Sequence, residues 1–152
     1  MANSYTQIHI QVVFAVKNRQ CLIHNSWKIE LYKYITGILQ NQGHKMIQIN
    51  GMPDHIHLLF GMRPTDSLSN LIKRVKQSSS KWINDNRLVL GKFSWQSGYG
   101  AFSYSKNQIA RVANYVSNQE EHHRTKSFRE EYIEFLKEFD VDYDERYLFE
   151  EI

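Results

Sequence analysis

The order of two hydrophobic periodicities most constrains what this chain can fold into. Alternation typical of strands occurs in "YTQIHIQVVFAV" (residues 5–16) and "HIHLLF" (55–60), and "KMIQI" (45–49) is also strand-like. Apolar residues recur at helical spacing in 26–43 and 67–83. The order strand, helix, strand, strand, helix, strand, helix predicts an α+β fold of ferredoxin-like (RRM-like) kind. We expect an antiparallel sheet with helices on one face, and an opposite face that is open to single-stranded nucleic acid.

Local signals refine these boundaries. Thr65 or Asp66 is the expected N-cap of the second helix. The glycine-rich segment 92–105 predicts an edge strand interrupted by a bend. Ser105 is expected to cap the next helix, which runs through "KNQIARVANYVSNQEEHH" and carries Tyr115.

The chain of 152 residues shows no internal repeat and no linker rich in Pro, Gly or Ser. This length suits one domain with a sizeable core. We therefore expect residues 1–126 to form the functional domain, including the helix of Tyr115. Residues 127–152, a helix and an acidic tail, are expected to belong to the same domain.

Charge is distributed unevenly along the chain. Residues 1–119 contain 14 Lys and Arg but only four acidic residues, whereas residues 120–152 contain five Lys and Arg and 12 acidic residues. A basic body indicates attraction to a polyanion such as nucleic acid. A solvated charged surface with an acidic terminal helix would give the same counts.

The single cysteine, Cys21, excludes an internal disulfide and a zinc site built from cysteines. No apolar run approaches the roughly 20 residues that span a bilayer. The start "MANSYTQIHIQ" lacks the features of a signal peptide. These observations predict a cytoplasmic protein that does not associate with a membrane.

Two histidines two residues apart interrupt the apolar run "PDHIHLLF". Successive side chains of a strand point to opposite faces, so His55 and His57 share a face while Ile56 and Leu58 share the other. Histidine is the commonest metal-binding side chain. Because a single His-x-His pair in a strand is more often structural, a metal site needs further support.

Tyr115 and Gln119 are four residues apart on the predicted helix and share one of its faces. Gln119 is a candidate third metal ligand. Spacing alone favours another interpretation, in which Tyr115 is a half-buried packing residue and Gln119 is a solvent-exposed amide. His122 and His123 follow at the end of this helix, where we expect them to be solvated.

These motifs, taken in order, resemble the single-tyrosine HUH transposases of small bacterial insertion sequences, the IS200-like type. The resemblance rests on "VVFAVKNRQ", "INGMPDHIHLLF", "LIKRVKQSSSKWI", "FSWQSGYGAFSYS", "YVSNQEEHHRTKSFREEY" and "YDERYLF". Each piece alone is weak, but the tyrosine 58 residues after His57 makes the combination specific.

The resemblance implies a transposase that cleaves and rejoins single-stranded DNA through a 5′-phosphotyrosine intermediate. Tyr115 would be the nucleophile, and His55, His57 and Gln119 would hold Mg²⁺ or Mn²⁺. An ordinary tyrosine has a pKa of about 10, so Lewis-acid assistance from such an ion would help it react. The implied partners are DNA with hairpin ends and a second subunit, in a homodimer whose tyrosine helices complete each other's sites in trans.

Six basic residues are candidate DNA contacts, although the helix among them could equally present an ordinary solvated face. They are Arg63, Lys73, Arg74, Lys76, Lys81 and Arg111. Two rival functions remain open. A non-catalytic module that binds single-stranded nucleic acid would ignore metal and Tyr115, and a phosphodiesterase would use water as its nucleophile.

Overall fold

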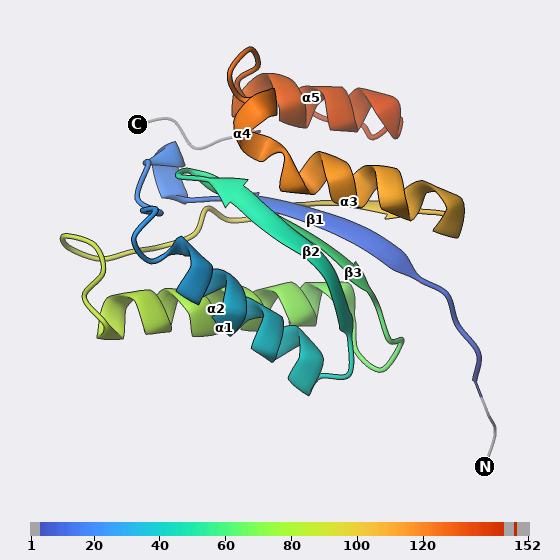
Figure 1. Cartoon of the computed structure of the whole chain (residues 1–152), viewed down its shortest axis with the longest axis horizontal. Helices are drawn as coiled ribbons and strands as arrows, with labels where there is room; N and C mark the ends of the chain where they lie inside the picture. Colours follow the sequence, from blue (N-terminus) through green and yellow to red (C-terminus); the bar gives the residue numbers. More distant parts are fainter. Residues whose placement is uncertain (1–3, 145–147, 149–152) are drawn as a thin grey trace.

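The computed structural model describes residues 4–144 and 148. Its strands and helices alternate as the periodicities predict (Figure 1). In chain order they are β1 (His9–Ala15), α1 (Lys28–Asn41), β2 (Lys45–Met52), β3 (His55–Gly61), α2 (Leu68–Asp85), β4 (Gly100–Tyr104), α3 (Ile109–Ser117), α4 (Gln119–His122) and α5 (Phe128–Glu138). Short 3₁₀ turns at Lys17–Arg19 and Lys106–Gln108 connect some of these elements.

The described strands form one sheet in the order β2-β3-β1-β4, and every neighbouring pair is antiparallel. This order, with α1 between β1 and β2 and α2 between β3 and β4, is ferredoxin-like and confirms the predicted fold class. Register places Val13 of β1 opposite His57 of β3 and Gln11 opposite Leu59. The central strands are therefore the ones that carry the histidine pair.

The strict alternation of β1 and β3 gives the sheet two different faces. One face presents Val12, Phe14, Ile56 and Leu58, all buried against α1 and α2. Burying this apolar surface supplies the main driving force for docking those helices. The other face presents the residues between these, among them His55 and His57.

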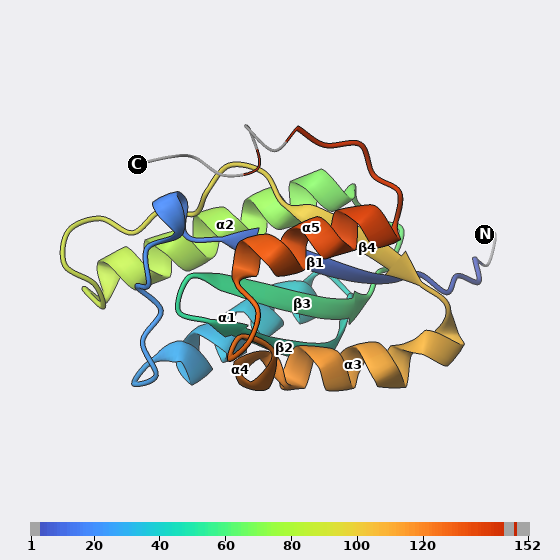
Figure 2. The same ribbon diagram turned by 90° about the horizontal axis from the view of Figure 1, so that it is seen from above.

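The second face is covered, which corrects the expectation of an open surface for nucleic acid. Helices α3, α4 and α5 lie on the side of the sheet opposite α1 and α2 (Figure 1). Phe135 of α5 packs on Phe102 of β4, and Val112 of α3 packs on Leu59. Figure 2 shows α5 lying across the sheet and α3 running beside β2. The helices that follow β4 bring apolar stripes of their own, which the sheet buries.

Helix α5 approaches β4 very closely at Gly100. A Cβ atom at this position would lie 2.9 Å from the Tyr132 ring, so the contact needs a residue without a side chain. Ser127 caps α5 by accepting a hydrogen bond from the backbone N–H of Glu130 at 3.1 Å. These contacts fix α5 on the sheet.

Several predicted boundaries were wrong in detail. Ser67 caps α2 instead of Thr65 or Asp66, and accepts a hydrogen bond from the Asn70 N–H at 3.1 Å. The ladder of β4 covers only Gly100–Tyr104, with an isolated bridge between Val16 and Trp95 before it. The helix expected to continue through Tyr115 and Gln119 is interrupted at Asn118, so Gln119 begins α4.

Candidate active site

His55 and His57 extend from β3 toward the layer formed by α3, α4 and α5. Both side chains are completely buried, and their ring centroids lie 5.2 Å apart. Strand alternation accounts for the shared direction that the sequence predicted. A buried imidazole pair needs hydrogen-bond partners at its ring nitrogens, because unpaired buried polar groups are costly.

Each ring has an oxygen acceptor at Nδ1. Asp54 Oδ1 accepts a hydrogen bond from His55 Nδ1 at 2.8 Å, and Gln11 Oε1 accepts one from His57 Nδ1 at 2.8 Å. The Gln11 amide nitrogen donates to the Tyr104 hydroxyl at 2.8 Å, which fixes the orientation of the amide. A neutral imidazole has a single N–H, so a ring that donates from Nδ1 presents a lone pair at Nε2. This is the tautomer that metal-binding histidines require.

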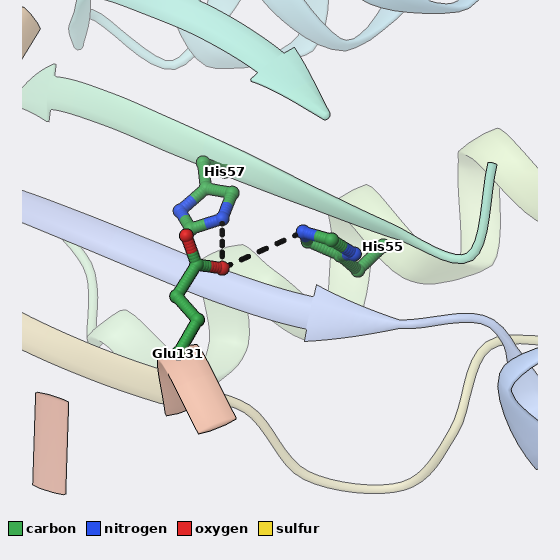
Figure 3. A group of neighbouring side chains, drawn as sticks. All are labelled: His55, His57 and Glu131. Carbon is green, nitrogen blue, oxygen red and sulfur yellow. Dashed lines mark hydrogen bonds and ion pairs between the residues drawn. The ribbon is translucent and has the colours of Figure 1, made fainter. Parts of the chain in front are cut away.

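A carboxylate from helix α5 faces the Nε2 atoms of both histidines. Glu131 of α5 is 2% exposed, and its Oε1 lies 3.0 Å from His57 Nε2 and 3.6 Å from His55 Nε2 (Figure 3). His123 Nε2 lies 3.2 Å from the same oxygen. The Gln119 amide donates to Glu131 Oε2 at 3.4 Å, while its oxygen lies 3.3 Å from His55 Nε2. The Glu131 carboxylate thus contacts all three histidines and Gln119.

The donor set fits a divalent metal ion. His55, His57 and Glu131 each offer one ligand atom, and these atoms all lie within 4.8 Å of one another. The same contacts serve as direct hydrogen bonds when Nε2 carries the proton, and can be shared by a cation when Nδ1 carries it. Nitrogen and oxygen ligands of one octahedral ion lie roughly 3 Å apart, close to the distance from His57 to Glu131. A site with imidazole and carboxylate ligands suits Mn²⁺ better than Mg²⁺, because Mg²⁺ prefers oxygen ligands.

Tyr115 lies on α3 and points at the same carboxylate. Its hydroxyl donates a hydrogen bond to Glu131 Oε2. The His122 ring stacks on the tyrosine ring at a centroid distance of 4.2 Å. A cavity of about 220 Å³ lies beside the tyrosine and is lined also by Gln11, Arg111 and Glu131. The hydroxyl is therefore held near the histidines and next to an open space.

Burial and charge both act on these groups. Burial raises the pKa of Tyr115, and the negative charge of Glu131 raises it further. Burial alone would raise the pKa of Glu131, but hydrogen bonds from His123, His57 and Tyr115 hold it below its ordinary value. Burial lowers the pKa of His57, although Glu131 opposes this. Neutral imidazole beside an ionised carboxylate is the state in which both can bind a metal.

The sequence model of the family described as "Transposase IS200 like" matches residues 4–119. This chain belongs to the IS200-like transposase family. The ISDra2 transposase TnpA of Deinococcus radiodurans is 23% identical over 118 residues, which cover 74% of this chain and 84% of that protein. Helix α5 lies beyond the residues that match the family.

Solved structures share the fold of this transposase. A crystal structure of a transposase candidate from Deinococcus radiodurans superposes with a TM-score of 0.62 at 22% identity, covering 78% of this chain and 96% of that one. The structure of a REP-associated tyrosine transposase bound to a REP hairpin gives a TM-score of 0.58 at 12% identity, covering 78% of this chain and 70% of that one.

The structure brings His55, His57, Tyr115 and Gln119 together, as the sequence suggested. Gln119 is completely buried beside His55 although it starts a new helix. The dimer expected in trans is not required for this proximity, since Tyr115 contacts Glu131 of its own chain. In the described part of this transposase, residues 4–144 and 148, no helix is long and apolar enough to cross a membrane.

The predicted DNA-binding residues are scattered. Arg111 lines the cavity beside Tyr115. Lys73, Lys76 and Lys81 line a separate groove of about 580 Å³ along α2, on the face of the sheet opposite the histidines. Some of the basic side chains already have protein partners: Arg74 pairs with Asp66, Lys81 with Asp85, and Lys76 donates to the Gln96 carbonyl. Arg63 follows β3, where its backbone N–H donates to His44 Nδ1.

Sequence reasoning missed Glu131, Gln11 and the contact made by His123. The His123 side chain is 7% exposed, so the expectation that it is solvated was wrong. A signal for Glu131 was present, because it shares a helix face with Phe128 and Phe135 at spacings of three and four residues. An acidic residue within an apolar stripe is either paired or functional.

Proposed function

We propose that this transposase cleaves and rejoins single-stranded DNA with Tyr115 as its nucleophile. The Tyr115 oxygen would bond to the scissile phosphorus while the bond from phosphorus to the 3′ oxygen breaks, so that the hydroxyl loses its proton and the leaving 3′ oxygen takes one up. The products are a 5′-phosphotyrosine and a free 3′-hydroxyl, and a second 3′-hydroxyl reverses the step. The ester linkage is conserved throughout, so no ATP or water is consumed.

One observation carries this proposal: the Tyr115 hydroxyl and the Nε2 atoms of His55 and His57 contact the same carboxylate. A hydroxyl next to a metal-binding pair suits phosphoryl transfer, in which the nucleophile and the stabilised phosphate oxygen must be neighbours. A water-activating phosphodiesterase gives no reason for a half-buried tyrosine at this point.

We propose that His55 and His57, with Gln119 or Glu131 as a further ligand, hold Mg²⁺ or Mn²⁺. When bound, the ion would supply Lewis-acid stabilisation of the phosphate. The protein residues have separate tasks. Asp54 and Gln11 hold the imidazole rings in the ligating tautomer, and Arg111 lies beside the cavity where a phosphate could approach Tyr115.

The proposed substrate is DNA with hairpin ends. A solved structure of similar fold is bound to a REP hairpin, which supports this choice. The basic balance of residues 1–119 also favours a polyanionic partner. The six basic residues Arg63, Lys73, Arg74, Lys76, Lys81 and Arg111 remain the proposed DNA contacts.

A covalent-adduct assay tests the chemistry. Purified protein is mixed with labelled single-stranded hairpin oligonucleotides from the DNA that flanks its gene, with Mn²⁺ or with EDTA, and resolved on a denaturing gel. We expect a protein–DNA band that requires metal and is absent from Tyr115→Phe. Tyr34→Phe, which keeps the stacking of this ring on Trp82 away from the site, is the matched control and should keep the band. Cleaved DNA without a band would indicate water attack, and binding without any product would indicate a non-catalytic module.

A mixing experiment tests how the subunits are arranged. We propose a homodimer in which each tyrosine acts at the histidine pair of its own chain, as the contact with Glu131 suggests. A mixture of Tyr115→Phe and His57→Ala subunits should then form no adduct. An adduct from the mixture would show instead that the tyrosine helix acts in trans.

A further inference from the structure

We propose that Glu131 is the positioning residue for the nucleophile, holding the Tyr115 hydroxyl beside the two histidines. This inference rests on the proposed function, because it assigns a role within the same site. It also makes α5, which lies outside the family match, a part of the active site.

The two oxygens of Glu131 face in different directions. Oε1 lies 3.0 Å from His57 Nε2 and 3.6 Å from His55 Nε2, whereas Oε2 accepts the hydrogen bond from the Tyr115 hydroxyl. The carboxylate therefore spans the gap between the metal-binding pair and the nucleophile. A reacting group fixed in this way has already lost the rotational freedom that it would otherwise lose in the transition state.

Helix α5 holds this carboxylate firmly. Phe128, one turn before Glu131, stacks on the His55 ring with centroids 3.9 Å apart and planes 11° apart. Phe135, one turn after it, stacks on Phe102 of β4 at 5.1 Å. Anchors on both sides leave Glu131, which is 2% exposed, with little freedom to change rotamer.

The remaining side of Tyr115 is open to substrate. The cavity of about 220 Å³ is bordered by Tyr115, Arg111 and Glu131. A DNA phosphate could approach the hydroxyl from this cavity while the carboxylate keeps its contacts. Arg111 would offer the phosphate a positive charge that offsets the carboxylates of Glu134 and Glu138, which also line the cavity.

The test uses Glu131→Gln and Glu131→Asp, with Glu130→Gln as the matched control. Glu130 is the neighbouring residue of α5, is exposed, and does not line the cavity beside Tyr115. Its carboxylate accepts a hydrogen bond from the Ser127 hydroxyl at 3.2 Å, which the amide oxygen of a glutamine can also accept. Glu131→Gln keeps the size of the side chain and removes its charge. Glu131→Asp keeps the charge and withdraws it from Tyr115 by one methylene group. Thermal unfolding of each variant checks that α5 remains docked.

Two readouts separate positioning from general damage. The first is the NMR signal of tyrosine labelled with ¹³C at Cζ, with Tyr115 assigned by its loss in Tyr115→Phe. We expect this signal to move in both Glu131 variants and to stay unchanged in Glu130→Gln. The second is the rate of adduct formation, which should fall about 10- to 100-fold while oligonucleotide affinity stays within about twofold of wild type.

An unmoved Tyr115 signal in a folded Glu131 variant would overturn the proposal. So would an adduct rate equal to wild type, or a faster one, since the latter would mean that the carboxylate keeps phosphate out. Failure of the proposed function is recognised separately. In that case the wild-type protein itself forms no adduct, while the NMR comparison still reports whether Glu131 holds Tyr115.

Discussion

The two faces of the central sheet are built from the same two strands but have opposite characters. Toward α1 and α2, β1 and β3 present Val12, Phe14, Ile56 and Leu58 to an apolar core. Toward α3, α4 and α5, the same strands present Gln11, His55 and His57 among apolar neighbours.

This difference shows how a small domain can bury polar side chains on one sheet face and keep an apolar core on the other. Alternation with period two lets each residue substitution affect one face alone. The apolar face tolerates little change in volume. On the other face, the buried polar groups satisfy one another through Asp54, Gln11 and Glu131. Variants on each face should therefore affect different properties.

Adjacent residues of β3 give the sharpest separation. His57→Ala should slow adduct formation roughly 1,000-fold, because Lewis-acid assistance worth several kcal/mol is lost. Leu58→Ala should lower the free energy of unfolding by about 2–5 kcal/mol and leave a folded protein with near-normal chemistry. Adduct kinetics and urea denaturation measure the two effects. Equal losses of activity per folded molecule in both variants would remove the distinction between the faces.

Gln11→Leu tests the sheet face that carries the histidines, at a residue that contacts the proposed metal ligand His57. Loss of the acceptor for His57 Nδ1 releases the ring from its ligating tautomer. Mn²⁺ affinity, measured by calorimetry without DNA, should fall about 10- to 100-fold. Val12→Ala, the next residue on the opposite face, is the control and should retain affinity. Unchanged affinity in Gln11→Leu would show that the amide does not orient the histidine.

Ser79→Ala tests the hydrogen bond between Trp95 and Ser79, on the α1 and α2 side of the sheet. The smallest effect on the adduct rate is expected here. Ser79 Oγ accepts a hydrogen bond from the buried Trp95 indole at 2.9 Å. Removing this acceptor should cost about 1–3 kcal/mol of stability, since the indole N–H is left buried without it. The adduct rate per folded molecule should not change. A slower reaction in Ser79→Ala would mean that the two faces are coupled.

Much of this arrangement could be predicted from the sequence. Period-two alternation in 5–16 and 55–60, and helical spacing in 26–43 and 67–83, were sufficient for the ferredoxin-like sheet. The same alternation predicted that His55 and His57 point the same way. Patterns of this kind report which side of an element is buried, because burial follows local periodicity.

What could not be predicted depends on contacts between distant segments. Local spacing gave no indication that α5 would fold back over β3, bringing Glu131 to His57 across 74 residues. For the same reason the second face of the sheet was expected to be open. His123 was expected to be solvated because it ends a helix, yet α5 covers it. The acidic tail beyond Asp144 lies largely outside the described residues, so its inclusion in the same domain stays a prediction.

The central claim is that Tyr115 becomes covalently attached to DNA beside a metal held by the histidine pair. Mass spectrometry of the adduct after protease and nuclease digestion tests it most directly, because the chain has nine tyrosines that could react. The account predicts a nucleotide on the peptide that contains Tyr115, formed with Mn²⁺ and absent with EDTA. Attachment to another residue, or the same adduct with EDTA, would contradict it.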